Sequence, residues 1–158
     1  MTDTAPRVGW RPLAVLVAGV CAVALAGVGA QSPDTARSLL DRGLALRGPE
    51  TLPEAEALFG RAVDLAVREE APVTEGHALR ALAQVRIARG DAAGAAAYWT
   101  RAEVLFTAAR DWHALGVLNN QRAFAAFADQ SQDEAERGWL AALAAFEAAD
   151  DAGEQGRA

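Results

Sequence analysis

The two histidines are the first candidates for chemistry, because imidazole is a common metal ligand and general base. His77 and His113 each lack a second histidine or cysteine at helical metal-ligand spacing. Zinc sites are built from several such ligands. The single cysteine, Cys21, lies in an apolar run near the amino terminus. We therefore expect no metal site, and we interpret the histidines as residues at the surface or near helix starts.

The stretch DQSQDEAERGWL, which begins at Asp129, resembles a calcium loop at first sight. A calcium loop needs glycine at its sixth position and glutamate at its twelfth. This stretch has Glu134 and Leu140 there. A turn followed by a capped helix explains the same residues better.

Motifs for other chemistries are missing from the sequence. It contains no glycine-rich phosphate loop, and no serine or cysteine is paired with a histidine. The carboxylate pairs Glu69-Glu70 and Asp150-Asp151 fall at predicted helix ends, where solvation explains them. We expect a protein that is not an enzyme and that needs no cofactor.

The composition indicates close-packed helices. Alanine supplies 40 of the 158 residues, and it is the best helix former and a poor strand former. All basic residues are arginine, and the net charge is −6. The chain has no block of basic residues, so we expect no nucleic-acid partner.

The amino terminus has the pattern of a targeting segment. Arg7 and Arg11 precede an uncharged stretch over 13–30, and the chain turns polar at Gln31. This pattern is typical of a secretory signal peptide over 1–30, with Val28 and Ala30 suited to the cleavage site. An uncleaved membrane anchor is the alternative. Either reading predicts that residues 31–158 lie outside the cytoplasm, periplasmic or secreted, with membrane contact only through 13–30 if the segment stays.

Residues of similar size recur about every 40 positions along the chain. Small, aromatic and small residues follow one another at spacings that place them on one helix face. A further small residue stands twelve positions before each group. The columns are Ala55, Ala95 and Ala135; Phe59, Trp99 and Trp139; Ala62, Ala102 and Ala142; and Gly43, Ala83 and Ala123. One turn further on, Ala66, Phe106 and Phe146 agree less strictly.

This register predicts pairs of helices separated by turn signals. The leading helix of each pair is expected over about 34–47, 74–89 and 112–128. The trailing helix is expected over about 52–69, 92–109 and 132–149. Thr51, Asp91 and Ser131 stand where each trailing helix begins, and all three are favourable N-cap types. Each pair has an apolar face that it cannot cover alone, so stacking the pairs creates the core.

The small–aromatic–small pattern, preceded by a small residue on the partner helix, resembles a tetratricopeptide repeat. The usual period is about 34 residues; the longer period here is similar to the variant in kinesin light chains and some bacterial transcription activators. The stretch ALGVLNNQRAFAAFADQSQDEAERGWLAALAAFEAA matches best. HEAT and armadillo repeats share the period but lack this signature. The resemblance implies an all-α solenoid of antiparallel helix pairs in the domain 31–158, with repeats at about 34–70, 74–110 and 112–150.

In this family the leading helices line a concave groove that holds a peptide or a partner protein. The resemblance carries this role to the matching positions Arg37, Leu40, Leu44, Arg47, His77, Arg80, Gln84, Ile87, Asn120, Phe124 and Phe127. Arg80, Gln84 and Asn120 are the strongest candidates, because polar side chains on an inner face can bond a peptide backbone or carboxylate. Ordinary core positions are the alternative for Phe124 and Phe127.

Two functions remain open at this point. The first is an extracytoplasmic adaptor that holds a peptide or partner protein in the groove. The second is a structural module that assembles with copies of itself or with a larger complex. Residues 150–158 read like the start of a fourth leading helix, which would leave the last trailing helix uncovered. We therefore expect self-association through Trp139, Leu143 and Phe146, or a longer natural chain that supplies the covering helix.

Overall fold

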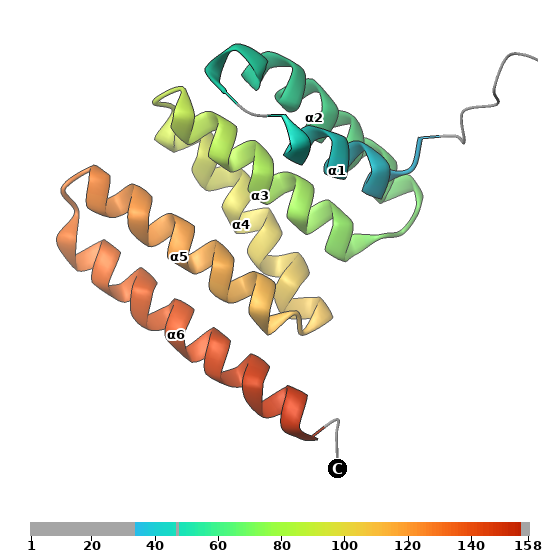
Figure 1. Cartoon of the computed structure of the whole chain (residues 1–158). Helices are drawn as coiled ribbons and strands as arrows, with labels where there is room; N and C mark the ends of the chain where they lie inside the picture. Colours follow the sequence, from blue (N-terminus) through green and yellow to red (C-terminus); the bar gives the residue numbers. More distant parts are fainter. Residues whose placement is uncertain (1–33, 47, 156–158) are drawn as a thin grey trace, which may run out of the picture. The chain divides into compact units, whose positions relative to one another are not determined.

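The computed structural model describes residues 34–46 and 48–155, and within these ranges the chain forms helices joined by short turns, with no strand (Figure 1). The predicted all-α class is confirmed. The expected helix pairs are also present, with ends close to the predicted ones. The elements are α1 (Ala36–Ala45), the short 3₁₀ helix η1 (Pro49–Thr51), α2 (Leu52–Arg68), α3 (Pro72–Ala88), α4 (Ala92–Ala109), α5 (Trp112–Ala128) and α6 (Gln132–Gln155).

One turn geometry recurs at four positions spaced 20 residues apart. Each turn contains a left-handed residue, and the next residue donates its amide to the carbonyl five positions earlier, at 2.9 Å in every turn. This is the hydrogen bond that closes many helix C-termini. The left-handed residues are Glu70, Gly90, Arg110 and Gln130. Such short connections make successive helices antiparallel, so one helix pair with its turns occupies the 40-residue period.

Capping side chains begin three of the helices. Thr35 and Ser38 form a reciprocal capping box at the start of α1. Asp91 accepts from the amide of Gly94 at 2.8 Å, and Asp111 caps α5 in the same way. Thr51 stands at the N-cap position of α2, as predicted, but its side chain makes no capping hydrogen bond. Its hydroxyl donates to the carbonyl of Gly48 instead, because the chain makes the extra turn η1 before α2 begins.

The small–aromatic–small columns form the core, as the register predicts. The alanines of both columns are buried in all three pairs, and Phe59 and Trp99 are only 5 % and 6 % exposed. Trp139, their counterpart in α6, is half-buried. One buried cluster joins α1, α2 and α3, and a second joins α3, α4 and α5. Burial of these faces between neighbouring helices supplies the main driving force for folding.

A second set of positions places a phenylalanine of the trailing helix against a glycine of the leading helix in the second and third pairs. A side-chain carbon added to Gly76 would lie 2.7 Å from the ring of Phe106, and one added to Gly116 would lie 2.6 Å from the ring of Phe146. Both rings therefore fill space that only glycine leaves open. In the first pair the equivalent residues are Ala36 and Ala66, two small residues with no exposed surface.

The last helix is longer than predicted. Residues 150–155 continue α6 without a break, so the interpretation of this stretch as the start of a fourth leading helix is wrong. Asp150 accordingly lies inside α6 and not at a helix end. Alanine dominates the preceding turns, no proline interrupts the helix, and α6 continues through Gly153.

The proposed targeting segment, residues 1–30, lies outside the described residues. None of the helices that the structure describes combines the length and the apolar character needed to cross a membrane.

Candidate functional site

A hollow of about 230 Å³ lies on the side of the molecule where the leading helices α1, α3 and α5 face each other. Its apolar part comes from α1, α2 and α3. Its polar part consists of three side chains from α3 and α5. The residues that define it are Leu44, Phe59, Val85, Arg80, Gln84 and Gln121.

Arg80 enters this hollow from the middle of α3 without a charged partner. No carboxylate in the described part of the chain lies within ion-pair distance of its guanidinium, and its Nε is buried without an acceptor. Burial lowers the pKa of Arg80 below its ordinary value, because the surroundings favour loss of charge. An anion or carbonyl that enters the hollow would therefore stabilise the charged guanidinium through a hydrogen bond.

Gln121 offers the complementary group from α5. Its Oε1 is buried and accepts no hydrogen bond within the described residues. Gln84, one turn after Arg80 on α3, is half-buried beside it. An unpaired buried donor and an unpaired buried acceptor each cost stability. A peptide group has both a carbonyl and an N–H, so a bound peptide backbone can satisfy both groups.

Sequence reasoning identified Arg80 and Gln84 but missed Gln121. The family register carried the role to Asn120, which is half-buried and does not line the hollow. The 40-residue register could have identified Gln121 through its equivalent position in the preceding repeat. Ala81 stands 40 residues earlier and also lines the hollow, so the two positions face the same space.

The remaining groove candidates lie elsewhere. Arg37 is exposed and forms an ion pair with Asp41 at 3.1 Å on the same helix. Phe124 and Phe127 are 58 % and 56 % exposed, so the alternative that they are core residues is wrong. Both rings project from α5, and the centre of each lies 5.8 Å from the centre of the Trp139 ring on α6. The three rings form an aromatic cluster outside the hollow.

Three further groove candidates divide between core and surface. Leu40 is buried, Leu44 is exposed, and Ile87 is half-buried. Leu44 alone among them lines the hollow. Arg47 lies outside the described residues.

The histidines have different surroundings. His113 is exposed, but His77 is half-buried with its ring 5.1 Å from that of Phe106. Burial, followed by the charge of Arg80, lowers the pKa of His77 below 6.5, although Asp111 acts in the opposite direction. Within the described residues, no group of three or more histidine, cysteine, aspartate or glutamate side chains is placed to hold a metal ion.

The residues predicted for self-association fall on two faces of α6. Phe146 packs against Gly116, and Trp139 contacts the two phenylalanines of α5. Both are half-buried and turned toward α5. Leu143 is 55 % exposed, and Leu140, which sequence reasoning missed, is 60 % exposed.

The carboxylate pair at the end of α2 has a structural role. Glu69 accepts from the amide of Ala36 at 3.2 Å with both of its oxygens, so it caps the start of α1 from a neighbouring helix. Solvation alone, the reading from sequence, does not explain it.

Comparison with known proteins adds no family to this description. No family model, curated protein or solved structure matches the chain. The geometry of the described helices is therefore the basis for a functional conclusion.

Proposed function

We propose that residues 31–158 form an α-solenoid of three tetratricopeptide-like repeats that binds an extended peptide or a segment of a partner protein. In this proposal the peptide crosses α1, α3 and α5 and places an apolar side chain in the hollow. The pattern of residues 1–30 supports delivery of this module outside the cytoplasm, as a secreted, periplasmic or membrane-anchored protein.

The unpaired polar atoms in the hollow are the observation that supports this function most strongly. Arg80 and Gln121 keep a buried donor and a buried acceptor without partners in a hollow whose other lining residues, apart from Gln84, are apolar. Most buried polar groups in folded proteins are satisfied, so such exceptions need an explanation. A ligand that combines an apolar side chain with a carbonyl or carboxylate explains both atoms together.

Selection from a random peptide library on the purified protein tests this proposal. We expect enriched peptides to place an acidic residue or free carboxyl end next to an apolar residue. Arg80→Ala should weaken the best of these peptides about 10- to 100-fold, the value of a charge-assisted hydrogen bond of about 1.5–3 kcal/mol. Fluorescence anisotropy of a labelled peptide measures the change.

Arg68→Ala is the matched control. Arg68 is an exposed arginine on the trailing helix α2, where its Nε donates to the carbonyl of Asp64 and it does not line the hollow. The Arg68→Ala substitution should leave the affinity for the peptide unchanged. Failure to enrich any peptide, or equal loss in both variants, would contradict a peptide site at Arg80.

Self-assembly is the second candidate function, and the exposed leucines of α6 support it. Leu140 and Leu143 lie one turn apart on a face of α6 that the described helices do not cover. Exposed apolar residues that cluster on one face are typical of interfaces.

For this second candidate, light scattering across a concentration series should show an oligomer that Leu143→Glu converts to a monomer. Thr100→Glu, on the exposed face of α4, is the control and should leave the mass unchanged. A monomer at all concentrations would rule the assembly function out.

A further inference from the structure

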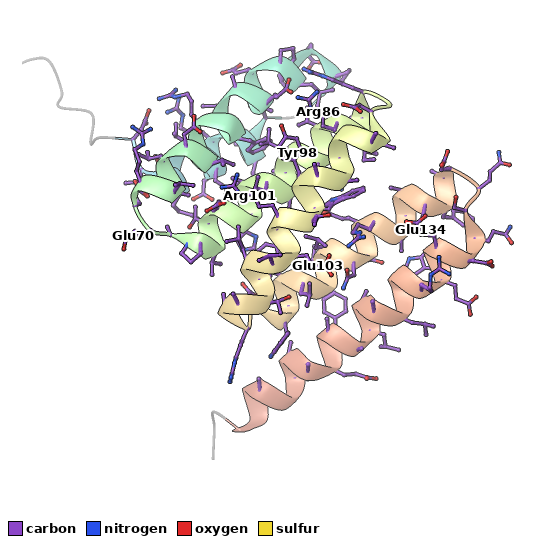
Figure 2. The ribbon with its side chains drawn as sticks, turned by 180° about the vertical axis from the view of Figure 1, so that it is seen from behind. Glu70, Arg86, Tyr98, Arg101, Glu103 and Glu134 are labelled. Atoms are coloured by element: carbon purple, nitrogen blue, oxygen red, sulfur yellow. The ribbon has the colours of Figure 1, made fainter. Side chains whose placement is uncertain are left out.

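The junction between the first two helix pairs is filled by charged and aromatic side chains. Glu56 of α2 forms an ion pair with Arg86 of α3 at 3.3 Å and a second one with Arg89, the residue that follows α3. The guanidinium of Arg86 also lies over the ring of Tyr98 from α4, 6.0 Å from its centre (Figure 2). A guanidinium over an aromatic face is a favourable contact. These side chains occupy the space between α2, α3 and α4.

Forty residues later, three of these four positions hold small residues, and the fourth, equivalent to Arg89, holds Asp129. Ala96, Ala126 and Gly138 stand where the first junction has its glutamate, arginine and tyrosine. Packing explains the glycine at position 138, because a side-chain carbon there would lie 2.8 Å from the Cβ of Ala123 on α5. The close approach of α5 and α6 at this point does not replace the missing ring or guanidinium. The second junction therefore keeps open space beside the ion pair of Arg122 and Glu103.

A cleft occupies the unfilled space, with α5 as its floor and α4 and α6 as its walls. It consists of two adjoining hollows of about 290 Å³ and 150 Å³, and both are lined by Arg122 and Glu134. Arg122 donates to Glu103 on the α4 wall at 2.8 Å. Figure 2 shows Glu103 and Glu134 on the two opposite walls. The cleft shares no lining residue with the hollow at Arg80.

Trp99 supplies a second, independent indication of a ligand. It lines the smaller hollow and is 94 % buried, since its exposed fraction is 6 %. Within the described residues its indole Nε1 donates to no acceptor. The equivalent residue of the first pair is Phe59, which has no donor to satisfy. The unpaired N–H is thus specific to the junction that also contains the cleft.

We propose that this cleft binds the tyrosine side chain of a partner peptide or protein segment. The first junction supplies the template, because there a tyrosine of the chain itself fills the equivalent space. In the second junction the phenol ring would lie among Ala96, Ala126 and Gly138. The ligand also supplies an acceptor for the indole of Trp99, while Arg122 and Glu134 are placed to bond its backbone. The inference adds a second site, on different helices, to the proposed peptide site.

The indole resonances of the ¹⁵N-labelled protein test this proposal with N-acetyl-tyrosinamide as the probe. The Trp99 signal is assigned by its loss in Trp99→Phe. We expect a saturable shift of that signal with a Kd of about a millimolar, the affinity that a ligand of this size can reach. N-acetyl-leucinamide, which lacks the ring, should bind at least tenfold more weakly. Equal shifts with both probes, or no saturable shift with the first, would overturn the proposal.

Two phenylalanine substitutions on α6 form a matched pair for the same titration. Ala141 lines the larger hollow, whereas Ala144 is exposed on the same helix and lines neither hollow. Ala141→Phe should fill the cleft and weaken binding of the tyrosine probe at least tenfold. Ala144→Phe should leave it unchanged. Unchanged binding in Ala141→Phe would place the probe elsewhere and overturn the site.

Two further variants distinguish a loss of probe binding at the cleft from unfolding of the protein and from binding in the hollow at Arg80. Ala96→Phe fills the cleft from the α4 wall, so it replaces Ala141→Phe if circular dichroism shows that the latter is unfolded. Arg80→Ala should leave the tyrosine probe bound. Loss of probe binding in Arg80→Ala would assign the probe to the hollow and overturn the cleft, whereas failure of peptide selection at Arg80 leaves this titration unaffected.

Discussion

Replacing Trp99 with alanine is expected to lower the free energy of unfolding by about 3–5 kcal/mol, the cost of deleting a large buried aromatic side chain. Trp99 is 6 % exposed and belongs to the cluster that joins α3, α4 and α5. The neighbouring columns are alanine, so few side chains can move into the space that the indole leaves. Chemical denaturation followed by circular dichroism measures the change.

Trp99→Phe is the control for this prediction. Phe59 occupies the equivalent position of the first pair and is 5 % exposed, so a phenylalanine fits this register. The substitution also removes the unpaired indole N–H, which offsets part of the lost packing. We expect a loss well below that of the alanine variant. A loss under about 1 kcal/mol in the alanine variant itself would show that the side chain is solvated.

The contact between Gly76 and Phe106 should give the second large effect. Phe106 has no exposed surface, and Phe106→Ala should cost about 3–5 kcal/mol. Gly76→Ala places a carbon 2.7 Å from the ring. The overpacking should cost about 1–3 kcal/mol. The better helix propensity of alanine offsets about 1 kcal/mol of that cost. In the double variant the ring is gone and the added methyl fits. The double loss should therefore be smaller than the sum, by a coupling of about 0.5–3 kcal/mol.

The chain contains both a natural counterpart and a control for this cycle. Ala36 and Ala66 already form the small–small combination at the equivalent positions of the first pair. Gly60→Ala adds a carbon that meets nothing within 4 Å, and it should raise stability by about 0.5–1 kcal/mol. Strict additivity of the Gly76 and Phe106 losses would show that the two residues do not contact each other in solution.

Much of the fold follows from the repeat. Alanine content and the 40-residue register predicted the helices, their pairing and the buried columns, because these features depend on spacing along one helix face. Thr51 stands at the N-cap of α2 as predicted, but the 3₁₀ turn before α2 directs its hydroxyl back to the carbonyl of Gly48. The prediction after residue 149 failed because helix propensity in the alanine-rich turns before it carries α6 on through Gly153 to Gln155.

The candidate sites were accessible from sequence only in part. Arg80 and Gln84 lie on one face of a single helix, so the register could find them. Gln121 comes from α5, and its approach to Arg80 depends on how far apart α3 and α5 pack. The cleft beside Trp99 depends on three substitutions in three helices, each unremarkable alone in an alanine-rich chain.

The sequence by itself determined the all-helical class, the 40-residue period of the helix pairs, and the small–aromatic–small columns that form the core. These are local properties, since helix propensity, capping and the 3.6-residue period act within about four residues. Only the tertiary structure decided which polar atoms lack partners and which junction remains open. Those outcomes depend on the sizes of residues where different helices cross, because the distance between helices varies with the side chains at the contact. A glycine at one crossing thus makes room for the ring of Phe106 or Phe146, and at another it helps leave a cleft that the chain does not fill.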